Sequence, residues 1–170
     1  MKVSVHSLAV DQVVHSLQQV LGFLDKAVAY AEAKKFDPLV LVNSRLAPDM
    51  HPFVRQIQFL SDGAKFGVAR LANVDAPKFE DTEKTVDELR ARIQKTIDYI
   101  KSVPASAFEG AEDREITIKL PNRTIEMSGL TYLRGWLLPN FFFHATTAYA
   151  ILRHNGVDVG KRDFLGDLTA

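Results

Sequence analysis

The spacing of the apolar residues constrains this chain most, because it repeats with the period of a helix in four separate segments. A helix turns about 100° per residue, so apolar residues three and four positions apart share one face. The four inward faces are Val10, Val13, Val14, Leu17, Leu21, Leu24, Val28 and Ala31; Phe53, Ile57, Leu60, Ala64, Val68 and Leu71; Val86, Leu89, Ile93, Ile97 and Ile100; and Leu130, Leu133, Leu137, Phe141, Ala148 and Ile151. Each predicted helix therefore has one face to bury.

Local signals predict where the first two helices end and begin. The first helix should stop near Lys35, and residues 37–48 should form a connection with room for a short helical turn. The second should start at Asp49, whose carboxylate can cap it, with Pro52 in the first turn, where a missing N–H does no harm. It should end near Asn73.

The third helix should open at Asp81 or Thr82 and close at Pro104. Glu88 and Arg92 are four residues apart, with the acid first, which is the favourable order for an ion pair on a helix surface. We expect that pair to be exposed.

Between Glu115 and Met127 the apolar residues alternate, which is typical of strands. The turn at residues 121–124 predicts a small β-hairpin, with Ser128 then capping the fourth helix and Asn155-Gly156 ending it. The predicted fold is all-α: a four-helix bundle with a small β-hairpin inserted before the last helix. We expect a single domain over residues 1–170, with a C-terminal tail at residues 157–170.

Composition excludes several classes of partner. Lys plus Arg and Asp plus Glu both number 21, so no basic excess exists to neutralise nucleic acid. No apolar run reaches the roughly 18 residues of a membrane span, and the first residues lack the apolar core of a signal peptide. The chain has no cysteine, which excludes disulfides and thiolate ligands and suits the cytoplasm. We therefore expect a cytoplasmic protein without nucleic-acid or membrane partners.

The fourth helix carries the strongest candidates for a site. His144 projects close to the centre of the apolar face, and Asn140 lies one turn before it. Pro139 cannot donate to the carbonyl four residues back, so the helix should kink or open beside them. Buried polar groups need partners, which leaves two interpretations: a ligand or metal pocket, or a core histidine bonded to a carbonyl or carboxylate.

Other polar residues near the start of the second helix could complete such a site. Asp49 lies nearer the inward side, although a capping role is the simpler explanation for it; His51 is poorly phased with the apolar face. A metal site needs three or four converging ligands, and an Asp49, Asn140 and His144 set would favour harder ions than zinc. Phe142 and Tyr149 point away from the main face, where they could pack under the hairpin or tail, line a pocket mouth or form a dimer surface.

Long segments of the chain are similar to one known family. They are Ala47-Pro48-Asp49-Met50, Arg55-Gln56, Pro139-Asn140-Phe141-Phe142-Phe143-His144, residues 147–156 and Gly160-Lys161. In these segments the chain resembles a bacterial domain-of-unknown-function branch of the DinB/YfiT-like superfamily. The resemblance covers nearly the whole chain and implies a DinB-like four-helix bundle, often dimeric in relatives.

The resemblance also implies what to look for at the site. Better-known members of the superfamily bind a divalent metal through three histidines, one on the second helix and two spaced four apart on the last. Some are thiol-dependent transferases or isomerases. His144 and, at the second-helix position, His51 match this pattern, whereas the remaining position is Asn140 or Ala148.

Three functions remain open from the sequence. The first is a small-ligand-binding or vestigial-metal bundle with a pocket near Asn140 and His144, its ligand an unknown small molecule. The second is a divalent-metal-dependent transferase or hydrolase with Asp49, His51, Asn140 and His144 near the metal, which would activate a bound water or thiol. The third is a structural or interaction protein, in which His144 is fully bonded. Whether the protein is an enzyme therefore stays open.

Overall fold

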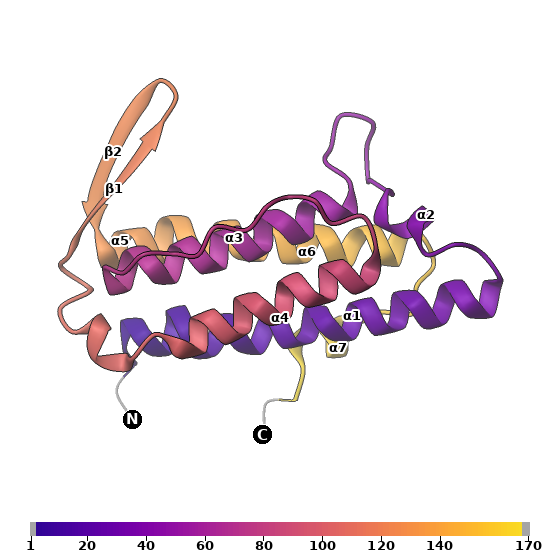
Figure 1. Ribbon diagram of the computed structural model, residues 1–170, viewed down its shortest axis with the longest axis horizontal. Coiled ribbons are helices and arrows are strands. Elements are labelled where there is room, and N and C mark those ends of the chain that lie inside the picture. Colours follow the sequence, from indigo (N-terminus) through magenta and orange to yellow (C-terminus); the bar gives the residue numbers. More distant parts are fainter. Residues whose placement is uncertain (1–2, 168–170) are drawn as a thin grey trace.

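Four long helices bury the four apolar faces against one another in the computed structural model, which describes residues 3–167. They are α1 (Gln12–Lys34), α3 (Phe53–Ala72), α4 (Val86–Ser102) and α6 (Leu138–His154). Helix α3 packs on α6 and α4, and α1 packs on α4 (Figure 1). The expected helical bundle with a hairpin is thus confirmed. Residues 1–2 and 168–170 of the expected domain and tail lie outside the described residues.

A long crossover joins α3 to α4. Residues 74–85, here called the strap, run back along the length of α3, so that α3 and α4 point in the same direction (Figure 1). No regular helix or strand forms within it. Because the strap spans the bundle, its residues meet side chains from both helices that it connects.

The start of α3 differs from the expectation. A short helix, α2 (Leu39–Val42), lies in the connection, and α3 begins only at Phe53, with Pro52 as its N-cap residue. The prediction that Asp49 caps this helix was wrong. Asp49 lies in a separate turn, and the carbonyl of Ser44 accepts from the Phe53 N–H at 2.9 Å, so the preceding loop supplies part of the cap.

Helix α4 begins later than its sequence suggested. Thr85 caps it through a reciprocal pair of bonds: its hydroxyl accepts from the Glu88 N–H, and the Glu88 carboxylate accepts from the Thr85 N–H. The backbone N–H of Lys84 and then that of Thr85, both donating to the Glu88 carboxylate, lower the pKa of Glu88. The expected start at Asp81 or Thr82 was wrong, and so was the expected pair of Glu88 with Arg92, because the cap occupies Glu88.

After α4 the chain forms a short 3-10 turn, η2 (Ala105–Phe108), and then the hairpin of β1 (Glu115–Leu120) and β2 (Arg123–Ser128). Ile116 lies opposite Met127 and Ile118 opposite Ile125. The two β1 isoleucines are buried, so this apolar face is covered, while the rest of the hairpin extends beyond the bundle (Figure 1). The alternating pattern therefore predicted the two strands. The turn is shorter than the expected residues 121–124, because Arg123 and Thr124 already pair with Leu120 and Lys119.

The last helix is continuous, but one of its turns is π-helical instead of α-helical. Ser128 caps α5 (Gly129–Tyr132), which passes through a π-helical turn, η3 (Leu133–Leu137), into α6. The Leu138 N–H bonds to Leu133, five residues back rather than four. The helix therefore opens next to Pro139, where a donor is missing. Leu130, expected to face the core, is 42% exposed because it lies before this turn.

The segment after α6 returns to the bundle. Gly156, with φ of 90°, ends the helix, and Val157 and Val159 are buried. Helix α7 (Lys161–Leu165) then lies on α1, where Lys26 pairs with Asp163 at 2.8 Å. Tyr149 packs between Phe23 and Phe164, under this segment. No helix among residues 3–167 is long and apolar enough to cross a membrane.

Candidate functional site

His144 is half-buried on α6 and bonds to a side chain of the neighbouring antiparallel helix. Its Nδ1 lies 2.8 Å from Oε1 of Gln56, a buried residue in the first turns of α3. The amide nitrogen of Gln56 in turn donates to the backbone carbonyl of His51, at 3.1 Å. Gln56 thus joins the start of α3 to the middle of α6.

This arrangement decides which nitrogen of His144 carries the proton. A carbonyl only accepts, so the side of Gln56 that faces the His51 carbonyl must be its NH₂ group. The opposite side is then the amide oxygen, which requires a donor, and Nδ1 of His144 must be that donor. Nε2 is left as an acceptor, and it has no bond to any residue that the structure describes.

His144 is held in its neutral form. Burial lowers the pKa of its imidazole below the usual 6.5, and the nearby His51 lowers it further, since two imidazolium charges would repel. A neutral imidazole with an unpaired Nε2 can accept a hydrogen bond, take a proton or bind a transition metal.

The surroundings of His144 are aromatic. The rings of His144 and His51 both lie against Phe59, with centroids 5.2 and 5.1 Å from it, and Phe143 contacts His144 edge-on. The Arg55 guanidinium also stacks over the ring of Phe59, 4.6 Å from its centre. The helical spacing predicted that His51 points away from the apolar face. It nevertheless comes near His144, because His51 precedes α3 and its direction does not follow the helical period.

The other two predicted residues are not part of this cluster. Asp49 is exposed and makes no hydrogen bond to residues 3–167. Asn140 is also exposed and points into a separate cleft beside the π-helical turn, so the expectation that its amide faces the core was wrong. The buried face of α6 is centred on Phe141, Ala145 and Ala148, which lies about a quarter of a turn from Asn140.

The donor set does not fit the three-histidine metal site of the superfamily. Among residues 3–167, no three His, Cys, Asp or Glu side chains are grouped so as to hold a metal ion. The position four residues after His144 is Ala148, which is fully buried and offers no ligand atom. Gln56, which bonds to His144, already uses its amide oxygen on that imidazole and its amide nitrogen on the backbone.

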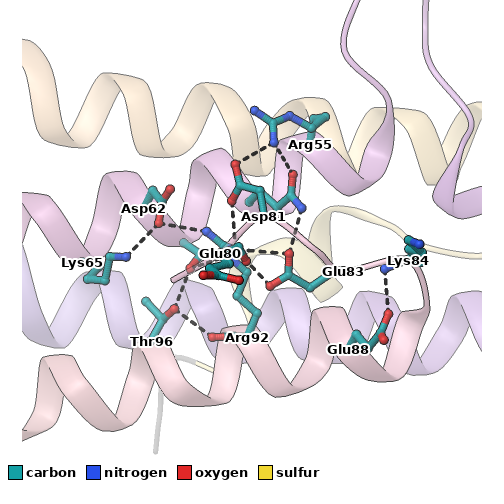
Figure 2. Close-up of polar contacts among 12 residues, drawn as sticks. Arg55, Asp62, Lys65, Glu80, Asp81, Glu83, Lys84, Glu88, Arg92 and Thr96 are labelled. Carbon is teal, nitrogen blue, oxygen red and sulfur yellow. Dashed lines mark hydrogen bonds and ion pairs between the residues drawn. The ribbon is translucent and has the colours of Figure 1, made fainter. Parts of the chain in front are cut away.

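A second polar cluster escaped the sequence analysis. Arg92 of α4 is buried and binds carboxylates from α3 and the strap: Asp62 at 2.9 Å, and Asp81 and Glu83 at 3.0 Å (Figure 2). Lys65, fully buried, lies 3.0 Å from Asp62 and over the ring of Phe79. In the sequence, Arg92 lies three residues after Leu89, on the apolar face of its helix. A charged residue at such a position was the signal that could have revealed the cluster.

The ionic cluster explains how the strap is held. Arg55 adds a bond to Asp81 at 2.7 Å, and Gln58 adds one to Glu83 at 2.8 Å. Three cations (Arg55, Lys65 and Arg92) face three carboxylates (Asp62, Asp81 and Glu83), so the charges balance. A balanced cluster around two buried cations, Arg92 and Lys65, attaches a segment; it does not by itself indicate a reaction.

Comparisons with known proteins agree with the resemblance seen in the sequence. The family model described as "Domain of unknown function (DUF1993)" matches residues 5–165. The crystal structure of a DinB family member protein from Shewanella denitrificans, at 1.83 Å resolution, is similar throughout. Its sequence is 42% identical, the match covers 97% of this chain and 93% of that chain, and the TM-score is 0.91. No curated protein matches this chain.

Proposed function

This chain belongs to the family described as a domain of unknown function, DUF1993, and we propose that it is a small-ligand-binding helical bundle whose binding site is built around His144. The DinB-like fold supplies the scaffold but not the activity, since one fold hosts unrelated functions. The proposal therefore rests on the side chains at the site.

The observation that carries the proposal is the bond between Gln56 and His144. It holds the imidazole in one tautomer, with Nε2 as a free acceptor, and the lowered pKa keeps that acceptor neutral at pH 7. A hydroxyl or amine of a ligand is the complementary group. Phe59 and Phe143 offer apolar contact next to it, which suits a ligand with one donor on an apolar body.

Binding is favoured over metal-dependent catalysis because the ligand set is incomplete. Two imidazoles lie against the same ring, but a third metal-binding side chain is missing from the described residues. Metal-activated water requires a metal held firmly by about three protein ligands. We interpret His51 and His144 as the remnant of such a set, now used for ligand recognition.

Side-chain NMR of the histidines tests the proposal. Protein labelled with ¹⁵N-histidine would be screened with small hydroxyl- and amine-bearing aromatic fragments. We expect binding fragments to shift the Nε2 resonance of His144 and not that of exposed His154, and we expect His144→Gln to abolish binding while His154→Gln does not. If no fragment moves His144 selectively, the proposal fails.

Metal analysis separates the two functions. Untagged protein purified from cells grown with added divalent ions should hold less than one equivalent of metal after dialysis. One equivalent that persists in the wild type and is lost in His144→Ala would overturn the proposal in favour of a metalloprotein.

A further inference from the structure

The strap, residues 74–85, is held to the bundle mainly by polar contacts. None of its residues is buried, and its one aromatic side chain, Phe79, is only partly covered. A cavity of about 340 Å³ lies between the strap and α4, beside Phe79 and Ala91. A second, of about 290 Å³, lies between residues 83–85 and α2. Because little apolar surface is buried under the strap, its attachment depends on charge.

Two carboxylates of the strap make that attachment. Asp81 bridges two arginines: its Oδ2 lies 2.7 Å from Nη1 of Arg55, and its Oδ1 lies 3.0 Å from Nη1 of Arg92. Glu83 accepts from the same Arg92 nitrogen at 3.0 Å and from the amide of Gln58 at 2.8 Å (Figure 2). Arg55 also donates to the oxygen of Gln58, at 2.7 Å. The two strap carboxylates thus share one compact set of donors on α3 and α4.

Without the strap this set of donors would carry excess positive charge. The side chain of Arg92 is 1% exposed, and Ser61 and Asp62 fix its Nε and Nη2. Lys65 is equally buried, lies 3.0 Å from Asp62 and makes no hydrogen bond to a described residue. Three cations, Arg55, Lys65 and Arg92, less the one carboxylate of Asp62 leave two positive charges. Buried charge without compensation is costly, so an open strap requires a dianion in its place.

We propose that the strap is a lid over a binding site for a phosphate dianion, and that Asp81 and Glu83 occupy the place of this ligand while the lid is closed. The phosphate oxygens bind Arg55, Gln58 and Arg92, the donors that the two carboxylates now share. Arginine binds phosphate through its planar set of N–H donors. A phosphate monoester carries a charge of about −1.5 to −2 at pH 7, which matches the two charges that the strap leaves behind.

Removing the strap carboxylates tests the competition. The double variant Asp81→Asn with Glu83→Gln keeps their shape and removes their charge. In calorimetric titrations with inorganic phosphate it should bind about tenfold more tightly than the wild type, because no carboxylate has to be displaced. Adding Arg55→Gln should weaken that binding about tenfold, since one of two arginines is lost. The control Asp25→Asn removes an exposed carboxylate paired with Arg90 and should bind as the wild type does.

Trypsin reports on opening of the lid in the wild type. Lys78 is exposed within the strap, and Lys119, exposed in the hairpin, is an internal control. Inorganic phosphate should speed cleavage after Lys78 about fivefold over sodium chloride of equal ionic strength, and should leave cleavage after Lys119 unchanged. Phenyl phosphate identifies the source of the dianion. Half-saturation below that of inorganic phosphate assigns the site to a monoester, whose ring the cavity beside Phe79 accepts, and half-saturation above it assigns the site to the free ion.

Three results would overturn the proposal. They are equal phosphate affinity in the wild type and the double variant, equal affinity with and without Arg55→Gln, and equal acceleration after Lys78 by phosphate and chloride, which is the result of screening alone. Circular dichroism establishes that each variant is folded. If the double variant is not, Asp81→Asn alone, in which Glu83 keeps its bond to Arg92, should still bind phosphate about threefold more tightly than the wild type.

This site is separate from the one proposed around His144. Because His144 takes no part in the ionic cluster, His144→Ala should leave both the phosphate titration and the cleavage after Lys78 unchanged. Failure of either proposal is therefore distinguishable from failure of the other.

Discussion

At the scale of single residues, each polar side chain at a helix contact bonds to neighbouring donors or acceptors that no other group has already paired. The amide nitrogen of Gln56 donates to the His51 backbone carbonyl, and its amide oxygen accepts from Nδ1 of His144. This second bond sets the tautomer of the imidazole. Glu88 is taken by the cap of α4, and Arg92 turns inward to the strap carboxylates instead. Three residues of ordinary type thus acquire roles that their spacing alone did not assign.

The lowered pKa of His144 gives a signed prediction. Because the folded state disfavours the charged imidazole, protonation favours the unfolded chain, and His144 contributes stability that is present above its usual pKa of 6.5 and lost as the pH falls below that value. Urea unfolding at about pH 7.5 and about pH 5.5 should show the wild type losing more stability over this interval than His144→Gln. An NMR titration midpoint for His144 above 6.5 would contradict it.

Replacing Arg92 is expected to lower the free energy of unfolding by a larger amount. Arg92→Leu leaves Asp62, Asp81 and Glu83 facing one another with less compensation, and should cost about 3–5 kcal/mol of unfolding free energy. The control is Arg90→Leu on the same helix, whose pair with Asp25 is largely exposed and should be worth about 0–1 kcal/mol. Chemical denaturation measures both unfolding free energies, and similar costs would refute a structural role for the ionic cluster around Arg92.

At the scale of elements, periodicity predicted most residues of the helix faces, whereas α3 and α4 begin later than expected. The last helix shows why a face can also be misplaced. A constant 100° per residue predicts its apolar face only for a regular α-helix, whereas η3 inserts a wider turn between Leu130 and Phe141. Residues before the turn therefore lie out of phase with those after it, which is how Leu130 and Asn140 came to be assigned to the core.

The start of α4 is the clearest test of an element boundary. Thr85→Ala removes one half of the capping box and should cost about 1 kcal/mol, within a range of about 0.5–2 kcal/mol. Thr82→Ala, at the start that the sequence suggested, should change stability by less than about 0.5 kcal/mol. Thermal or denaturant unfolding compares the two, and the reverse order would show that the helix begins at residue 82.

At the scale of the whole molecule, the crossover organises the bundle. Because α3 and α4 point the same way, the strap must run the length of the molecule, and the ionic cluster of Arg55, Lys65 and Arg92 holds it there (Figures 1 and 2). The segment after α6 serves α1 in a similar way through Lys26. Two segments without long helices are thus held against the bundle by ion pairs: the strap against α3 and α4, and the segment after α6 against α1.

The homodimer that the resemblance implies stays a prediction, and one residue makes it testable. Phe143 is 58% exposed, which is unusual for so large an apolar side chain on a helix. If α6 forms the dimer surface, sedimentation equilibrium should show a dimer that Phe143→Ser weakens at least tenfold. Val40→Ser, at a similarly exposed apolar position on α2, should not weaken it. A wild-type monomer at all concentrations would exclude the dimer.

The sequence by itself determined the class of fold, the approximate helices and the two strands of the hairpin, because hydrophobic burial acts through local periodicity that a linear pattern records. It also singled out His144 and Pro139. Only the tertiary structure decided the partners: Gln56 for His144, the strap carboxylates for Arg92, and the cleft in place of the core for Asn140. Hydrogen bonds and ion pairs depend on distances between residues far apart in the chain, and those distances exist only once the helices have packed.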